Sequence, residues 1–202
     1  MFGQVGELII SPDLSSAVRH HRIQTMKMNA IDQFGMDTVD AILSLIEKDN
    51  SRYLQALVLL YSAIDTLAWA SLTSGDVTRL GFCDWVDKYM QPKLKLGCTS
   101  SDIYGARCSI LHSSAAESSL SRQGNVSELW YVTSPSSAAQ IEAQIKKEGA
   151  HAKVVCFTSL VDAFTNGASR FSDDITEDQN KFALCTERMK RWLKFVPTNT
   201  LK

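Results

Sequence analysis

The 202-residue chain has few of the residues that interrupt helices. It contains four prolines and ten glycines, which argues against a sandwich of short strands joined by tight turns. Its five cysteines are odd in number and widely spaced, and no Cys-x-x-Cys pair occurs among them. A disulfide framework and a zinc site are therefore not expected. We expect a mainly helical protein with reduced thiols, no metal and no cofactor.

The chain also lacks a strong charge of either sign and a long uninterrupted apolar run. A net charge of −1 gives no overall attraction to nucleic acid or anionic lipid, so binding to either would need a local patch. The most apolar stretch, 53–72, is interrupted by Gln55, Ser62 and Asp65, which leaves too little hydrocarbon to span a bilayer. The first residues do not show the pattern of a signal peptide. We expect a soluble, cytoplasmic protein with no membrane partner.

The length fits a single domain over 1–202 with one sizeable core. The helix near 51–72 is apolar nearly all round, which is typical of a central helix or of one covered by a partner chain. The predicted fold class is mainly α: a helical bundle with a small two-stranded β element in the C-terminal half. Periodicity and end signals predict a loose N-terminal arm with a short strand at 7–10, a weak helix at 13–30, firm helices at 36–48, 51–72, 82–89, 100–112, 135–147, 159–171 and 177–195, and strands at 128–133 and 152–158.

The end of the predicted helix 100–112 carries an arginine and a histidine five positions apart, Arg107 and His112. No glycine-rich phosphate loop, His-Glu-x-x-His or Gly-x-Ser-x-Gly motif competes with this pair. With four histidines in the chain, one such spacing is unsurprising by chance, so its meaning depends on context. The context is an amphipathic helix, late in a helical array and after the apolar helix.

In these residues, Arg107-Cys-Ser-Ile-Leu-His112, the chain resembles the HEPN superfamily, the helical domains of many prokaryotic toxins and defence ribonucleases. That family carries Arg-x4–6-His near the end of a late helix of its bundle. The resemblance implies an HEPN-like helical core over 31–120 and a β/α elaboration over 125–202 that packs on it. Active family members usually have a polar residue directly after the arginine, where this chain has Cys108.

The resemblance implies a metal-independent endoribonuclease that acts as a homodimer, in a defence or toxin–antitoxin context. Arg107 would hold the phosphate through its bidentate fork, and His112 would transfer protons. One histidine cannot easily serve both sides of the phosphorus, and a dimer would bring two pairs into one cleft. The partners would be a second copy, RNA and an antitoxin or other protein. The supporting residues would be Asp65, which would orient Arg107, and Cys108, Ser109 and Ser113.

Five residues on an ideal helix turn through about 500°, which leaves Arg107 and His112 about 140° apart. Their convergence needs the long arginine side chain, a distorted last turn or a second protomer. This separation and Cys108 favour an alternative, a catalytically inactive HEPN-like module that binds RNA, a nucleotide or a protein. A third interpretation is an unrelated helical interaction protein, in which Arg107 simply pairs with a carboxylate such as Asp65.

The last predicted helix carries four cations that could meet an RNA backbone, although a solvated basic face is the default interpretation of such a pattern. These residues are Arg188, Lys190, Arg191 and Lys194.

Overall fold

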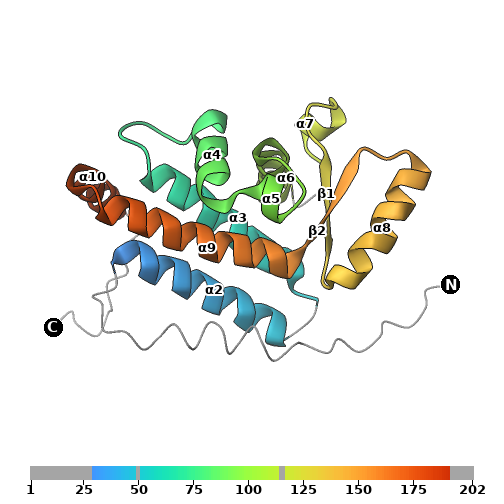
Figure 1. Ribbon diagram of the computed structural model, residues 1–202, viewed down its shortest axis with the longest axis horizontal. Coiled ribbons are helices and arrows are strands. Elements are labelled where there is room, and N and C mark those ends of the chain that lie inside the picture. Colours follow the sequence, from blue (N-terminus) through green and yellow to red (C-terminus); the bar gives the residue numbers. More distant parts are fainter. Residues whose placement is uncertain (1–28, 49–50, 114–116, 192–202) are drawn as a thin grey trace.

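The computed structural model describes residues 29–48, 51–113 and 117–191, and these form a mainly helical protein with a two-stranded parallel sheet (Figure 1). The predicted fold class, mainly α with a small β element in the C-terminal half, is confirmed. The strand predicted at 7–10 lies outside the described residues, as does nearly all of the helix predicted at 13–30.

Three long helices form the centre of the molecule: α2 (Ala30–Lys48), α3 (Tyr53–Ala70) and α9 (Phe157–Thr176). Each packs on the other two, and α2 and α9 run side by side (Figure 1). Leu60 of α3 and Phe164 of α9 are among the fully buried side chains. The segment predicted as an elaboration, 125–202, therefore supplies one of the central helices, so the core is not confined to 31–120.

Helix α2 begins before the predicted start at 36 because Asn29 caps it. The side chain of Asn29 accepts hydrogen bonds from the backbone N–H groups of Ile31 and Asp32, at 2.9 and 3.1 Å, and so satisfies two donors of the first turn. Asp37, next to the predicted start, lies inside the helix and accepts a hydrogen bond from the Gln33 amide at 2.6 Å. The helix consequently begins earlier than its apolar stripe suggests.

Helix α3 is, within the described residues, the only one long and apolar enough to cross a bilayer by length and composition. Half of this segment is buried inside the protein, and the core helix of a soluble protein meets the same criterion. Leu54 and Val58 remain exposed on its outer side, at 41% and 36%. This helix therefore does not mark the chain as a membrane protein.

Helix α4 (Arg79–Trp85) continues into one π-helical turn, η1 (Val86–Met90). The chain reverses at Gln91, which adopts a left-handed conformation with φ of 53°, an uncommon one for a residue other than glycine. Pro92 then opens the short helix α5 (Pro92–Lys95). The helix predicted at 82–89 thus begins earlier, at Arg79, and its last turn ends at Met90.

Helix α6 (Ser100–Ser113) carries the predicted arginine and histidine. Its cap is Thr99, because the Thr99 hydroxyl accepts the backbone N–H of Asp102 at 3.1 Å and the Asp102 carboxylate accepts that of Thr99 at 2.8 Å. This reciprocal pair has the form of a capping box. Ser100 is the first residue of the helix, as the predicted range 100–112 has it.

A short helix, α7 (Ser119–Arg122), leads into a strand–helix–strand unit of β1 (Glu128–Val132), α8 (Pro135–Glu148) and β2 (Ala152–Cys156). Both strands and α8 lie where they were predicted, with proline in the first turn of α8. The strands pair in parallel, from Glu128 opposite Ala152 to Val132 opposite Cys156. Parallel strands need a long crossover, which α8 provides.

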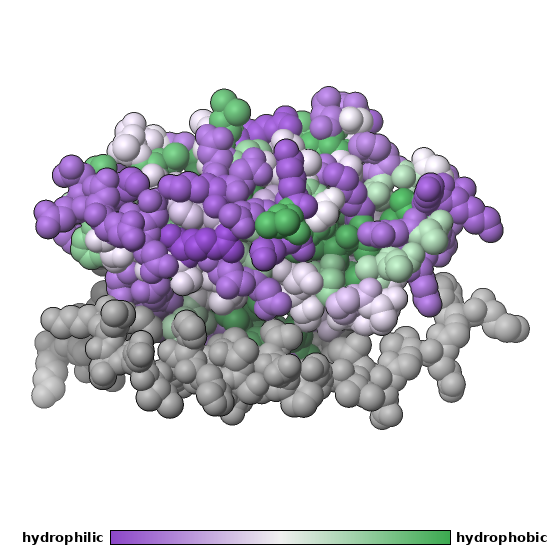
Figure 2. All heavy atoms as spheres, in the orientation of Figure 1, coloured by the Kyte–Doolittle hydropathy of each residue, from purple (hydrophilic) through white to green (hydrophobic). Residues whose placement is uncertain are grey.

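Strand β2 passes directly into α9 with no intervening loop, and α10 (Gln179–Met189) follows. Helix α9 is longer than predicted, and α10 ends before the predicted limit of 195; the residues beyond 191 lie outside the described part. Figure 2 shows that the face over α9 and α10 is largely hydrophilic, while apolar residues gather toward the strand–helix–strand unit.

One buried carboxylate joins that unit to the helical bundle. The Asp102 side chain, 5% exposed, accepts hydrogen bonds from the hydroxyl of Thr99, the backbone N–H of Ser127 and the ammonium group of Lys153, at 2.8, 2.7 and 2.8 Å. Burial alone would raise the pKa of Asp102, but these hydrogen bonds outweigh burial and lower it. The ionised carboxylate thus connects α6, the segment before β1, and β2.

Two further contacts support this junction. The hydroxyl groups of Tyr61 in α3 and Tyr131 in β1 share a hydrogen bond of 2.6 Å. Gly105 of α6 lies so close to Val126 that an added Cβ atom would come within 2.6 Å of a valine methyl carbon, a contact that a folded protein does not tolerate without movement. The close approach of α6 to the strand–helix–strand unit therefore requires glycine at this position.

We predict that Asp102→Ala lowers the free energy of unfolding at pH 7 by about 3–5 kcal/mol, because it leaves the Lys153 ammonium and three backbone or hydroxyl donors without their partner. Urea unfolding measures this loss, and Asp84→Ala, at an exposed position of α4, is the matched control with an expected change within about 0.5 kcal/mol.

The pKa of Asp102 is lower in the folded protein than in the unfolded chain, so its contribution is present above the unfolded value of about 4 and is lost as the pH falls through the folded one. The stability difference between wild type and Asp102→Ala should accordingly shrink below pH 4. A difference that stays constant down to pH 2 would contradict the assigned role.

Candidate functional site

The predicted pair is in contact. The Arg107 Nη1 atom lies 3.3 Å from Nε2 of His112, although both residues sit on one regular α-helix that continues to Ser113. The length of the arginine side chain, rather than a distorted last turn, therefore bridges the predicted angular separation. His112 is exposed, whereas the Arg107 side chain is only 18% exposed. The site has a largely covered cation beside an accessible imidazole.

The arginine is held from a second helix. Its Nη2 atom donates to the carboxylate of Asp65 in α3 at 2.7 Å. Asp65 is the one charged residue of α3, and a charge in such an apolar helix needs a partner. The predicted contact between Asp65 and Arg107 is thus confirmed. Burial opposes charge on the guanidinium, but the adjacent carboxylate outweighs it and raises the pKa of Arg107, which stays cationic.

The contacts leave part of the guanidinium available. An arginine has five N–H donors. One N–H of Arg107 is bound by Asp65, one N–H points to His112, and Nε is buried without a hydrogen-bond partner among the described residues, as is Oδ1 of Asp65. At most two donors therefore remain, one on each Nη atom, and the Cys108 thiol also interacts with this guanidinium. Because a guanidinium only donates, its contact with His112 is a hydrogen bond when Nε2 of the imidazole is unprotonated.

An aromatic ring lies one turn before the arginine. The ring of Tyr104 has its centre 6.0 Å from Cζ of Arg107 and 5.8 Å from Cζ of Arg79, the first residue of α4. Both distances are within the range of a cation–π interaction. Phe82 contacts the same ring in an edge-on arrangement, with 5.4 Å between the centres.

The sequence interpretation missed Tyr104 and Arg79. The spacing of three between Tyr104 and Arg107 is one at which helical side chains meet, so Tyr104 could have been found. No local pattern connects Arg79 to this helix.

Cys108 interacts with both Tyr104 and Arg107. Burial, and then the neighbouring thiol, raises the pKa of the Tyr104 hydroxyl. The half-buried cysteine therefore packs beside the pair. Its supporting role stays a prediction.

The Ser109 side chain is buried, and its hydroxyl donates to the carbonyl of Ala106 at 2.9 Å. It lies one turn before His112 on α6, at a spacing at which helical side chains are neighbours. Its supporting role stays a prediction. Ser113 is the last residue of α6, and its side chain lies outside the described part of the protein.

The prediction that Arg188 contacts RNA is wrong. Its side chain is buried, with its guanidinium 4.9 Å from the Trp69 ring and hydrogen bonds to the carbonyls of Trp69 and Gly75 at 3.1 and 3.2 Å. It fastens α10 to the end of α3. Lys190 forms an ion pair with Glu187, Arg191 is exposed, and Lys194 lies outside the described residues.

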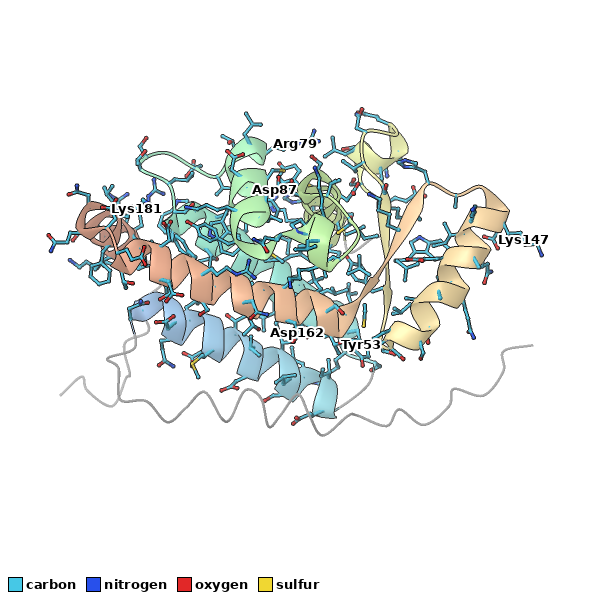
Figure 3. The ribbon with its side chains drawn as sticks, viewed as in Figure 1. Tyr53, Arg79, Asp87, Lys147, Asp162 and Lys181 are labelled. Atoms are coloured by element: carbon cyan, nitrogen blue, oxygen red, sulfur yellow. The ribbon has the colours of Figure 1, made fainter. Side chains whose placement is uncertain are left out.

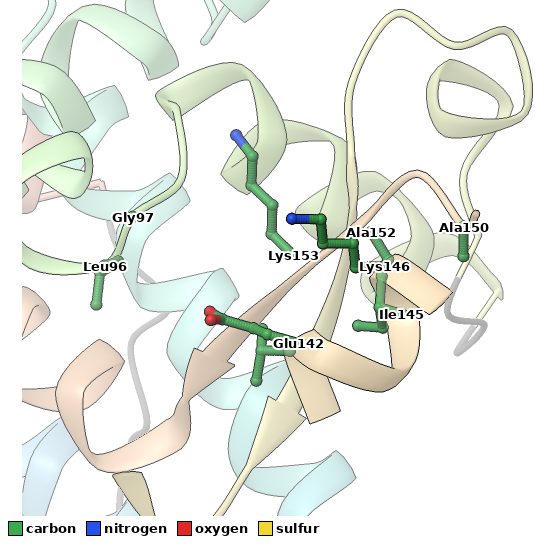
Figure 4. A pocket seen from close by; sticks show the side chains of 9 residues that line it. Leu96, Gly97, Glu142, Ile145, Lys146, Ala150, Ala152 and Lys153 are labelled. Atoms are coloured by element: carbon green, nitrogen blue, oxygen red, sulfur yellow. The ribbon is translucent and has the colours of Figure 1, made fainter. Parts of the chain in front are cut away.

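A separate hollow of about 320 Å³ lies between the turn after α5, α8 and β2 (Figure 4). Glu142, Lys146 and Lys153 are the charged residues that line it, and the ammonium group of Lys153 is already bound by Asp102. The hollow contains neither member of the Arg107–His112 pair. Within the described residues, no group of three or more His, Cys, Asp or Glu side chains could hold a metal ion.

We predict that Asp65 and Arg107 are energetically coupled by about 0.5–3 kcal/mol in a double-mutant cycle of Asp65→Ala and Arg107→Ala, because both groups are mostly removed from water. Urea unfolding of the four proteins measures the coupling. The exposed Lys190–Glu187 pair is the control, for which no coupling above the experimental error is expected. Equal results for the two pairs would show that Asp65 does not hold Arg107.

Comparison with protein-family models, with curated proteins and with solved structures returns no match to this chain. The geometry of the Arg107–His112 pair and its neighbours is therefore the observation that bears on function.

Proposed function

We propose that the protein is a metal-independent endoribonuclease of the HEPN type, which acts in the cytoplasm as a homodimer on single-stranded RNA. The observation that carries this proposal is the contact of 3.3 Å between Arg107 and His112, with Asp65 holding the arginine from the other side. It places a phosphate-binding cation directly beside a side chain that exchanges protons near neutral pH.

The geometry supports cleavage by the RNA's own 2′-hydroxyl. When RNA binds, Nε2 of His112 exchanges its contact with Arg107 for the 2′-hydroxyl and takes the proton of that hydroxyl as its oxygen bonds to phosphorus. The bond from phosphorus to the 5′-oxygen breaks, and that oxygen must receive a proton. The Nη donors of Arg107 that Asp65 does not bind stabilise the negative charge of the phosphorane. The products are a 2′,3′-cyclic phosphate and a 5′-hydroxyl.

The second proton has to come from the opposite side of the phosphorus, and we propose that His112 of a second copy supplies it. The exposed Leu54 and Val58 lie on α3 within about 40° of each other and of Asp65 around the helix axis. Leu54 and Val58 are therefore on the same side of α3 as Asp65, about 16 and 10 Å from it along the helix axis. A second copy packed on this side of α3 would bring the two Arg107–His112 pairs toward each other. A defence or toxin–antitoxin role, with an antitoxin as a further partner, completes the proposal.

A second candidate function is a catalytically inactive module that binds RNA, a nucleotide or a protein. Two observations favour it. Asp65 already occupies one edge of the guanidinium, with the Arg107 side chain only 18% exposed, and Cys108 stands where active family members have a polar group. This module would bind its ligand through the same surface without cleaving it.

We predict that the purified protein cleaves a fluorescent single-stranded RNA in EDTA. His112→Ala should lower the rate at least 100-fold, since it removes the proton acceptor, and Arg107→Ala should lower it by about 100–1000-fold. His151→Ala, at an exposed histidine before β2, is the control and should cleave like wild type. Undiminished cleavage by His112→Ala would exclude the mechanism, and RNA binding without cleavage by wild type would favour the inactive module.

We also predict that the double variant Leu54→Glu, Val58→Glu is monomeric and cleaves RNA at least ten times more slowly, because two charges on the exposed face of α3 oppose association. Analytical ultracentrifugation gives the oligomeric state, and circular dichroism tests that the variant is folded. Leu94→Glu, at a leucine of α5 that is 77% exposed, should remain dimeric. A monomeric wild type with full activity would contradict the shared site.

A further inference from the structure

Next to the Arg107–His112 pair, α6 packs against α4 through Tyr104. We propose that Arg79 and Tyr104 form a second RNA subsite, in which Arg79 binds the phosphate adjacent to the one held by Arg107. This inference rests on the proposed function, because it assumes that an RNA strand is bound at Arg107 and His112. Arg79, labelled in Figure 3, lies at the start of α4 and is exposed.

The geometry places the two arginines on one aromatic ring. Cζ of Arg79 and Cζ of Arg107 lie 5.8 and 6.0 Å from the centre of the Tyr104 ring, so the two guanidinium groups are at most about 12 Å apart. Phe82 contacts that ring edge-on and helps to fix its position. The ring therefore holds two cations at a separation that one or two nucleotides of an extended strand can span.

The charges of the two arginines are compensated differently. Arg107 forms an ion pair with Asp65, whereas no carboxylate among the described residues lies within ion-pair distance of Arg79. Asp87, which follows α4 in η1, accepts a hydrogen bond from the Ser100 hydroxyl at 2.7 Å and forms no ion pair with Arg79. Arg79 thus presents a largely uncompensated charge to solvent.

A phosphate is the ligand that this arrangement favours. The cation–π contact to Tyr104 is weak at an exposed site, so Arg79 can exchange it for the stronger charge-assisted hydrogen bonds to a phosphate oxygen. Since the whole chain has a net charge of −1, local cations decide where an anionic strand binds. Aromatic rings beside cations are also the usual components of sites for single-stranded nucleic acid.

The experiment compares two substrates that differ in the number of phosphates. A dinucleoside monophosphate has only the reactive phosphate, whereas an RNA of eight nucleotides also reaches Arg79. For Arg79→Ala we expect KM for the longer RNA to rise about tenfold with kcat unchanged, and no change for the dinucleotide. The control is Arg52→Ala, at an exposed arginine at the opposite end of α3 from Asp65, which should behave like wild type with both substrates.

Binding of the longer RNA to His112→Ala, followed by fluorescence anisotropy at several salt concentrations, gives a second measurement. Adding Arg79→Ala should reduce the slope of log affinity against log salt by about 0.7, the value for one phosphate contact on a single strand. Arg79→Lys should restore most of that slope, because the charge is kept.

The outcomes separate the two proposals. If wild type cleaves RNA and Arg79→Ala changes neither KM nor the salt slope, the subsite is wrong and the ribonuclease stands. An equal loss for both substrates would also overturn the subsite, since Arg79 would then act on the reactive phosphate or on the fold. A wild type that neither cleaves nor binds RNA overturns the proposed function and the subsite together.

Discussion

The arrangement of this protein depends on a single ionised carboxylate in a nearly water-free position. Asp102 caps α6 together with Thr99 and at the same time holds Ser127 and Lys153, which belong to the strand–helix–strand unit. A buried charge is costly unless it is paired and fully hydrogen-bonded, so these partners have to be in place together. The direction of α6 is therefore set at its first turn by contacts from three segments of the chain.

The other half of α6 is held by a second ion pair, between Arg107 and Asp65. The helix is thus fastened to β2 near its start and to α3 farther along. Such attachment suits a functional surface, because side chains on a rigid element keep their relative positions. His112 follows both Asp102 and Arg107 on α6 and is exposed. The side chain to which we assign proton transfer is therefore accessible to solvent, whereas Arg107 is held by Asp65.

Part of this structure follows from local sequence. The strands were placed almost to the residue because short β-prone runs are bounded by Pro135 and by Gly149, which ends α8 in a left-handed conformation. The partner of Arg107 was also predictable, since a lone carboxylate in an apolar helix must be compensated. The parallel direction of the strands was not predicted, although the strand–helix–strand order of the predicted elements favours it.

The predictions that failed concern residues whose contacts come from distant parts of the chain. Arg188 was expected on a basic exposed face, but it is buried, because it donates to the carbonyls of Trp69 and Gly75 and its guanidinium lies against the Trp69 ring. Arg79 and Tyr104 come from two helices whose packing no periodicity reveals. The HEPN resemblance and the ribonuclease remain predictions, because they rest on six residues and one contact.

The direct passage of β2 into α9 has a consequence for the order in which the protein can be made. Helix α9 ends at Thr176, so the faces of α2 and α3 that pack on it stay uncovered until the chain has been synthesised beyond this residue. Partly folded chains with exposed apolar surface aggregate readily or bind chaperones. The centre formed by the three long helices is therefore complete only after α9 has been made, and not when α2 and α3 alone are present.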